Sequence, residues 1–481
     1  MSSSVKVNYI LTMLNTGSQM LFPLLTFPYI CEILTPESIG QVNFYNSIIN
    51  YIILFTSLGI PMYAIREIAR KRNNVVLMSS TTIEIFILHC ILTFLGYIIV
   101  FALCLFVSSI QINIPLFLLL SLSLFFTTIG CEWFYNGIEE FKYITIRGLV
   151  VRVIAIGMLF IFVKSESDLL YFGCYSVIGA IGSNIFNFFR LKKYLRFERG
   201  MISRLNIFQH FLPSLKVFSF TFITSSYLQL NPIILGFMKD VAAVGYFTTS
   251  TKIIFVMIQI TTSLGAVMMP RTSNLLSENK QTEFFQLTQK SYDFTLAITI
   301  PLTALLISIA PMLILWLCGD KFFESILPFQ IISPVIFIVG VSNVLGMQIL
   351  YPMGRINDVI KCTLIGAIVN LIFNFVLVPY YSYVGTSIAY LLAELATTLS
   401  MFFIAKKDIR INCFKKEHLH YFFGSFWVVI SLYVWNSFSE CSYLVDLVVS
   451  SCISLIVYLL FLFFVRDKLF MSMMRQQFKI K

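Results

Sequence analysis

The hydrophobic residues of the chain fall into long apolar segments that are separated by short polar connections. An apolar run of about 20 residues can cross the hydrocarbon core of a membrane as a helix, and the pattern contains fourteen such runs. Transmembrane β-strands would appear as roughly ten-residue segments of alternating hydrophobicity, and the sequence shows no such alternation. We therefore predict an all-α polytopic membrane protein with spans at about 7–33, 40–65, 77–107, 113–137, 143–163, 169–189, 207–237, 241–269, 285–317, 326–352, 359–379, 383–405, 419–437 and 443–465.

Polar residues recur at helical spacing inside several of these spans. In the first span, Asn8, Thr12, Asn15 and Gln19 follow one another at intervals that place them on one helix face. Polar groups that face lipid are costly, so these faces are predicted to point into the protein. They form either hydrogen bonds that hold a bundle together or the wall of a water-filled cavity, which we favour. The other polar positions of this kind are Asn46 and Asn50 in the second span and Gln259 in the eighth.

An internal repeat with an offset of about 205 residues relates the second span to the eighth. The matching positions are Gly40, Ser-Leu-Gly at 57–59 and Arg66 in the second span, and Gly245, Ser-Leu-Gly at 263–265 and Arg271 in the eighth. An offset of six helices gives two copies that point the same way, which is a parallel repeat. We predict a six-helix lobe at 1–205, a second at 206–411, and two further helices with a tail at 412–481.

The positive charges indicate the sidedness of the chain. If both termini are cytoplasmic, most of the 34 Lys and Arg fall in cytoplasmic connections, as the positive-inside rule requires. The net charge of +11 is then explained by basic loops beside an anionic leaflet, and it needs no nucleic-acid partner. The ten Cys and four His are scattered, so we predict no metal and no cofactor. His418 and His420 lie in a basic connection and are predicted to be solvated.

Seven ionisable residues fall inside the predicted spans, where each costs roughly 2.5–3.5 kcal/mol at a helix centre. Residues placed at this cost usually mark a pathway or pair with one another. Glu84 and Asp293 are near predicted cytoplasmic ends, where a local ion pair explains them equally well. The seven residues are Glu84, Glu132, Arg152, Lys216, Lys252, Asp293 and Glu394.

The stretch at 130–153 combines charges with aromatic residues. Arg147 and Arg152 are five positions apart, which is about 140° around a helix, so they are predicted to face different neighbours. Trp133, Phe134 and Tyr135 are predicted to anchor a cytoplasmic turn at the membrane interface. Neither feature explains why Glu132 and Arg152 lie inside spans.

Three passages resemble the oligosaccharide flippases of the polysaccharide transporter family, which belongs to the multidrug/oligosaccharidyl-lipid/polysaccharide exporter superfamily. They are SLGIPMYAIREIARKRNN at 57–74, the stretch at 132–153, and the long passage at 339–394. The resemblance implies two six-helix lobes around a central, often cationic cavity that works by alternating access. It also implies a bacterial inner-membrane protein that moves a polyprenyl-diphosphate-linked oligosaccharide to the outer leaflet for surface polysaccharide synthesis.

A substrate of this kind would be recognised by cations for its diphosphate and by polar groups for its sugars. The candidate partners are the lipid-linked oligosaccharide, membrane lipids and other glycan assembly proteins. Transport is expected to couple to H+ or Na+ through Glu132, Asp293 or Glu394. The candidate diphosphate-binding cations are Arg66, Arg147, Arg152, Lys216, Lys252 and Arg271, and the candidate cavity polar residues are Asn8, Asn15, Gln19, Asn46, Asn50 and Gln259.

Three other functions remain open at this point. A drug or cation exporter of the same superfamily would prefer acidic residues in its cavity. The acidic residues inside the predicted spans are compatible with this function. A glycan polymerase or acyltransferase would need a catalytic cluster, and no nucleophile–base spacing, metal set or phosphate loop is present. We therefore predict a transporter and not an enzyme. A scaffold for a glycan assembly complex would not need polar intramembrane stripes.

Overall fold

A computed structural model describes residues 5–196, 201, 205–406, 410–439 and 442–478. These residues form helices and connections without a strand, which confirms the all-α prediction. The chain divides into two compact units, Met1–Gly245 (unit 1) and Tyr246–Lys481 (unit 2), each of which is described by itself. The predicted lobe boundaries rest on the sequence repeat, a different criterion, and stay a prediction.

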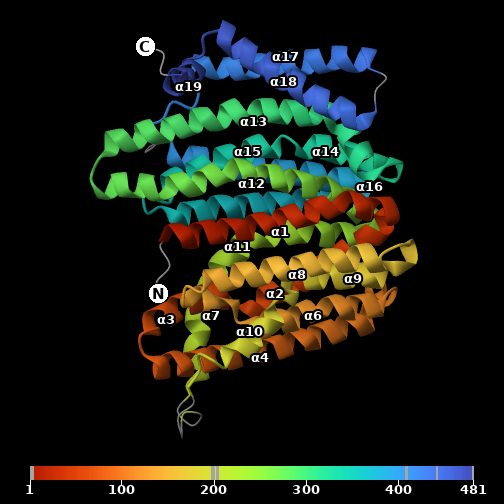
Figure 1. Ribbon diagram of the computed structural model, residues 1–481, viewed down its shortest axis with the longest axis vertical. Coiled ribbons are helices and arrows are strands. Elements are labelled where there is room, and N and C mark those ends of the chain that lie inside the picture. The colour runs from red at the N-terminus through yellow and green to blue at the C-terminus, as the bar shows by residue number, and fades with distance from the viewer. Residues whose placement is uncertain (1–4, 197–200, 202–204, 407–409, 440–441, 479–481) are drawn as a thin grey trace. The chain divides into compact units, whose positions relative to one another are not determined.

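Unit 1 is a bundle in which helices pack side by side (Figure 1). Helix α1 packs along α8, helix α2 lies against α4, α6 and α11, and the short α3 packs on α4 and α7. The helices are α1 Val5–Ile33, α2 Pro36–Ser57, α3 Ile60–Lys71, α4 Val75–Phe106, α5 Ser108–Gln111, α6 Ile114–Gly130, α7 Glu132–Gly137, α8 Phe141–Phe162, α9 Leu169–Val177, α10 Asn184–Leu191 and α11 Phe211–Met238, with short turns η1 Glu166–Asp168, η2 Ile178–Gly182 and η4 Ile207–His210.

Unit 2 is built around α13, which packs against α15, α17 and α18. Helix α16 lies along α14 and α15 in the same unit. The elements are α12 Val241–Ser277, which begins in the last residues of unit 1, α13 Gln281–Cys318, η5 Asp320–Ser325, α14 Ile326–Ile332, α15 Val335–Asn343, η6 Val344–Leu350, α16 Ile356–Ala405, α17 Lys416–Phe438, α18 Tyr443–Phe464 and α19 Lys468–Phe478.

Each of the fourteen predicted spans coincides with a helix or with a run of consecutive helices. Eight helices among the described residues are long and apolar enough to cross a membrane, or up to ten when each of two bent pairs counts as one span. Helices α1, α11 and α17 coincide with predicted spans without belonging to those eight. The 50-residue α16 contains two predicted spans, which meet at Ser382, where a φ of 49° interrupts the helix. The chain is a multi-pass membrane protein.

The predicted second span is broken at the Ser-Leu-Gly tripeptide. Helices α2 and α3 meet at an angle of 40°, and Leu58 and Gly59 have φ values of 43° and 69°. A Cβ atom on Gly59 would lie 2.6 Å from the backbone nitrogen of Phe218, so α11 approaches this turn too closely for any side chain. The matching tripeptide at 263–265 lies inside the continuous helix α12, so the same three residues adopt two conformations.

A second break turns the aromatic residues of α7 into the bundle. Helix α6 ends at Gly130, Cys131 has a φ of 40°, and α7 starts at Glu132. Trp133, Phe134 and Tyr135 are buried in a core that also holds residues of α3, α4, α8 and α10. Their prediction as interfacial anchors is wrong, because the break at Cys131 redirects this segment away from the surface.

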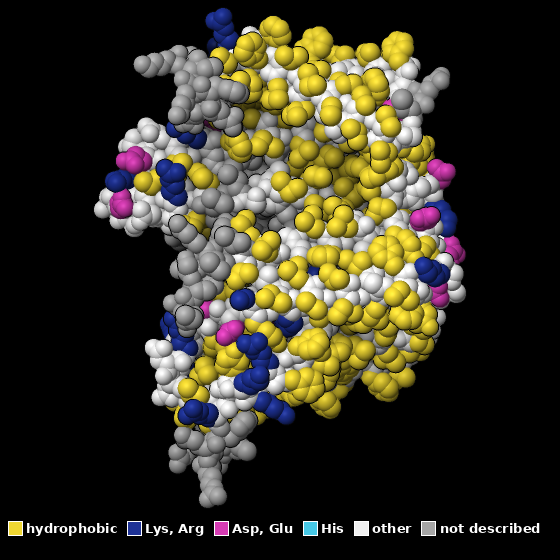
Figure 2. Space-filling view, in the orientation of Figure 1, with side chains coloured by type: hydrophobic (Ala, Val, Ile, Leu, Met, Phe, Trp, Pro, Cys, Tyr) yellow, Lys and Arg dark blue, Asp and Glu magenta, His cyan; other side chains and the backbone are white. Residues whose placement is uncertain are grey.

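Apolar side chains cover the middle stretches of the helices, and charged side chains gather toward helix ends (Figure 2). Dark blue Lys and Arg side chains gather over the left-hand ends of α8 and α10 in this view. Many large apolar residues are exposed on the helix surfaces. A surface of this kind is expected where a helix faces hydrocarbon rather than water.

Candidate functional site

Arg152 joins α8 to the polar face of α1. Its side chain is buried, and its Nη1 atom donates to Ser18 Oγ at 2.5 Å, while both Nη1 and Nη2 lie 3.2 Å from Asn15 Oδ1. Gly148, one turn earlier on α8, leaves room for this contact, since a Cβ there would lie 3.1 Å from Asn15 Oδ1. The structure thus brings together two residues that the sequence predicted separately, Arg152 and Asn15. Their functional role stays a prediction.

Arg147 and Arg152 have different neighbours, as the spacing predicted. Arg147 is 8% exposed, and its Nη2 atom lies 3.9 Å from the carboxylate of Glu132 at the start of α7. Its guanidinium carbon is 5.6 Å from the centre of the Tyr143 ring. The buried Nε and Nη1 atoms have no hydrogen-bond partner among the described residues. Arg147 therefore has two buried donors that an anion could satisfy.

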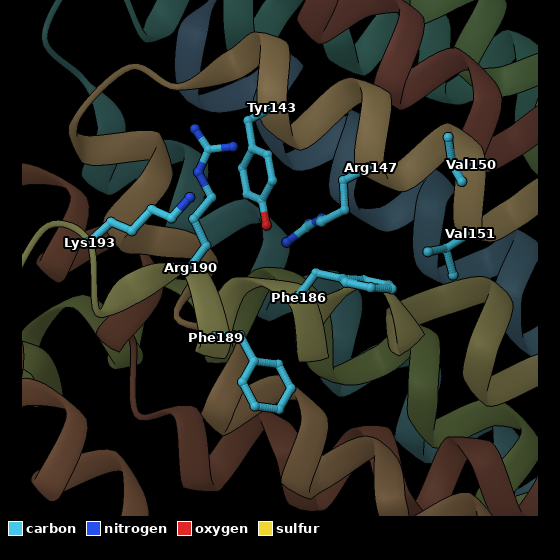
Figure 3. A pocket seen from close by; sticks show the side chains of 8 residues that line it. All are labelled: Tyr143, Arg147, Val150, Val151, Phe186, Phe189, Arg190 and Lys193. Atoms are coloured by element: carbon cyan, nitrogen blue, oxygen red, sulfur yellow. The ribbon is translucent and has the colours of Figure 1, made fainter.

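A cavity of about 450 Å³ lies beside Arg147 between α8 and α10. A second hollow of about 330 Å³ adjoins it and is lined by Glu140, Lys142 and Ile146 as well as by residues of the first. Figure 3 shows the charged groups on one side of the cavity and two valines on the other. The lining residues of the larger cavity are Tyr143, Arg147, Val150, Val151, Phe186, Phe189, Arg190 and Lys193.

Sequence reasoning missed Arg190 and Lys193 as site residues. Both lie in a basic group at 190–199, which the positive-inside rule explains without a binding role. In the structure the Arg190 guanidinium stacks on the Tyr143 ring at 3.9 Å and lies 3.5 Å from Glu140. No spacing rule joins residues of two separate helices, so only their packing reveals this cluster.

The remaining candidates in unit 1 are more dispersed. Asn46 on α2 donates to Ser176 on α9 at 3.2 Å, which is a contact that holds helices together. Arg66 on α3 is exposed and pairs with its neighbour Glu67 at 3.6 Å. Lys216 on α11, Gln19 on α1 and Asn50 on α2 are exposed, and the side chain of Asn8 is outside the described part of the chain.

In unit 2, the candidates on α12 and α16 differ in burial. Lys252 is half-buried, and Gln259 and Arg271 are exposed. Glu394 on α16 is 5% exposed, so its carboxylate is enclosed by protein. Both Lys252 and Glu394 interact with other groups. Their proposed roles in substrate binding and ion coupling stay predictions.

Asp293 is held in a network that ties α17 to α13. Its carboxylate accepts hydrogen bonds from Lys415 Nζ at 2.7 Å and Gln289 Nε2 at 2.7 Å, and lies 2.9 Å from His418 Nε2. A local ion pair was one of the two explanations that the sequence allowed for Asp293, and the structure contains that pair. His418 is 5% exposed, so the prediction of a solvated His418 is wrong. The ring also packs against the rings of Tyr292 and Tyr421.

Glu84 also takes part in a local network, in unit 1. Its carboxylate lies 2.9 Å from His210 Nε2, and accepts from the backbone of Asn206 at 2.8 Å and from Gln209 at 2.9 Å. His210 Nδ1 lies 2.7 Å from the Tyr63 hydroxyl on α3. These contacts attach the segment before α11 to α3 and α4. Among the described residues, no group of three His, Cys, Asp or Glu is arranged to hold a metal ion.

Comparison with known proteins supports the resemblance seen in the sequence. The family model described as "Polysaccharide biosynthesis protein" matches residues 5–276, more than half of the chain. The putative O-antigen transporter of Escherichia coli (strain K12) is 24% identical over 409 residues, covering 85% of this chain and 98% of the relative. A putative O-antigen transporter of Shigella dysenteriae is 25% identical over 402 residues, covering 82% and 99%.

A solved structure has the same fold. It is the lipid II flippase MurJ in an inward closed conformation, with a TM-score of 0.72 at 14% identity, covering 96% of this chain and 99% of that one. At this identity the likeness shows the fold alone. The family assignment rests instead on the matched family model, which covers two of the three passages, those at 57–74 and 132–153. This chain belongs to the polysaccharide biosynthesis protein family.

Proposed function

We propose that this protein is a flippase that moves a polyprenyl-diphosphate-linked oligosaccharide from the cytoplasmic to the outer leaflet of a bacterial inner membrane. Two relatives that match most of the chain are named putative O-antigen transporters, and the similar fold belongs to a lipid II flippase. The transported unit serves surface polysaccharide synthesis. Both termini are cytoplasmic, and the protein moves its substrate by alternating access without changing it covalently.

The observation that carries this proposal is the buried Arg152 with its partners on α1. A charged side chain near the middle of a span costs roughly 2.5–3.5 kcal/mol, and here Asn15 and Ser18 satisfy it. A bundle that only had to be stable would be served as well by apolar packing. Amide, hydroxyl and guanidinium groups are the partners that sugars and phosphates need when they leave water.

The other charged candidates receive roles within the same mechanism. The six cations named from the sequence compensate the diphosphate, and the polar stripe on α1 and its counterparts contact sugars. Glu394, Glu132 or Asp293 couples transport to H+ or Na+; the enclosed carboxylate of Glu394 favours this residue. Drug export is the competing function, and membership of the polysaccharide biosynthesis protein family argues against it.

The test is to delete the gene in its host and measure the lipid-linked glycan on each membrane leaflet. Wild type is expected to restore outer-leaflet glycan, whereas Arg152→Gln restores little at equal protein level. Lys164→Gln is the matched control, because Lys164 is an exposed cation just after α8. If deletion leaves glycan display unchanged and instead alters drug resistance, the proposal is wrong.

A further inference from the structure

We propose that the cavity between α8 and α10 is a lateral docking site for the diphosphate headgroup of a polyprenyl lipid. This inference rests on the proposed function and names the place where the substrate is first held. The headgroup lies against Arg147, Arg190 and Lys193, and the first part of the lipid chain lies along Phe186, Phe189 and Val150.

The first argument is that two of the donor atoms of Arg147 lack partners. Its guanidinium is buried, yet Nε and Nη1 have no hydrogen-bond partner among the described residues, and Glu132 approaches only Nη2, at 3.9 Å. A buried donor without a partner costs about 1–3 kcal/mol. Arg190 has the same feature at its Nε atom. Both helices that form the cavity thus present unused donors, which an anion can satisfy.

The charge of the site fits a diphosphate. The two adjoining hollows are lined by the cations Lys142, Arg147, Arg190 and Lys193, and the carboxylates beside them are Glu132 and Glu140. Four positive charges against two negative ones leave two positive charges. A diphosphate diester carries two negative charges, whereas the phosphodiester of phosphatidylglycerol carries one. The balance therefore favours the diphosphate over an ordinary phospholipid.

The shape and the surroundings indicate a lipid rather than a soluble anion. Figure 3 shows the cavity with Lys193, Arg190 and Tyr143 on one side and the valines on the other. The residues at its rim, Ile146, Val150, Phe186 and Phe189, are 51–63% exposed. Apolar side chains exposed to this extent on a membrane helix face hydrocarbon. A ligand that enters here comes from the bilayer, with an apolar chain attached to its charged head.

Arg190 is held in place before the ligand arrives. Arg190 stacks on Tyr143 at 3.9 Å and also donates to the Tyr194 hydroxyl at 3.2 Å. The Tyr135 hydroxyl donates to the backbone oxygen of Asn187 at 2.6 Å, which ties α10 to α7. Groups that need little reordering bind an anion at lower entropic cost. A cavity of about 450 Å³ is large enough for the headgroup and leaves the sugars outside.

The experiment measures lipid binding to the purified full-length protein by native mass spectrometry and by competition in lipid nanodiscs. The probes are undecaprenyl diphosphate, phosphatidylglycerol and inorganic diphosphate. Wild type is expected to bind undecaprenyl diphosphate at least about tenfold more tightly than either competitor. Arg190→Gln and Lys193→Gln, which alter partly exposed side chains and should fold, are each expected to weaken this binding by about tenfold, since one charge-assisted bond is worth about 1.4 kcal/mol or more.

Lys164→Gln is the control and is expected to bind as wild type does. Equal binding of phosphatidylglycerol would assign the site to a resident phospholipid and overturn the proposal, and equal binding of inorganic diphosphate would overturn the role of the lipid chain. Unchanged binding in both Arg190→Gln and Lys193→Gln would also overturn it. The binding assay measures lipid binding at this site independently of transport. Weakened binding together with reduced glycan export in Arg190→Gln or Lys193→Gln would support this site, whereas export that is unaffected by deletion of the gene would instead count against the flippase function.

Discussion

Removal of the Glu84 carboxylate should destabilise unit 1 by several kcal/mol. In Glu84→Ala, His210 Nε2, Gln209 Nε2 and the backbone nitrogen of Asn206 all lose their partner. Breaking a buried pair by removing one member costs about 3–5 kcal/mol. The three bonds share one carboxylate, so their separate values cannot be added. We expect a loss of about 3–5 kcal/mol, which at about 2 °C per kcal/mol lowers Tm by about 6–10 °C.

The assay is thermal unfolding of the purified protein in detergent, followed by the fluorescence of a cysteine-reactive dye. Glu84→Gln keeps one carbonyl acceptor and should fall between Glu84→Ala and wild type. The control is Glu37→Ala, because Glu37 is an exposed residue in the first turn of α2 and its loss should cost at most about 1 kcal/mol. A Glu84→Ala protein that unfolds within 2 °C (about 1 kcal/mol) of wild type would refute the assignment of this network to stability.

Three further outcomes follow from the contacts. Asp293→Ala should release Lys415 and His418 and speed cleavage of the 410–415 segment in limited proteolysis, whereas Glu278→Ala in the exposed α12–α13 turn should not. Gly59→Ala should lower Tm by about 2–6 °C, because its Cβ would lie 2.6 Å from Phe218 N at positive φ; an unchanged Tm would contradict this. Arg152→Lys should reduce glycan export about tenfold, because Lys cannot reproduce the paired contact with Asn15; full export would rule out that contact's role.

The helices could be located from the sequence because each span forms a helix in hydrocarbon independently of the other spans. An apolar segment of sufficient length forms a helix in a membrane wherever its neighbours lie, since its backbone must satisfy its own hydrogen bonds. The fourteen predicted spans therefore coincide with helices. The breaks at Leu58 and Cys131 were not predicted, because they depend on the close approach of α11 to α3 and on the packing of α7 into the core.

The candidate site was predictable only one residue at a time. Arg152 and Asn15 stood out because each is polar within an apolar span, and the structure joins them across α1 and α8. Arg190 did not stand out, because a basic residue at a helix end is expected from sidedness alone. Trp133 and His418 were misassigned to the membrane interface and to solvent, and both are buried. In each case the deciding contact comes from a distant part of the chain.

The sequence by itself determined the membrane class, the helical content, the positions of the spans and the polar face of α1. These properties follow from local composition and from the period of the helix, which every segment carries within itself. The tertiary structure alone decided which charges meet. Arg147 remains with unused donors beside Arg190, whereas Arg152, five residues further along α8, is satisfied by α1. Whether a charged side chain has a partner depends on which group the packing of the chain brings within about 3–4 Å of it. The position of that group is not encoded in any single segment.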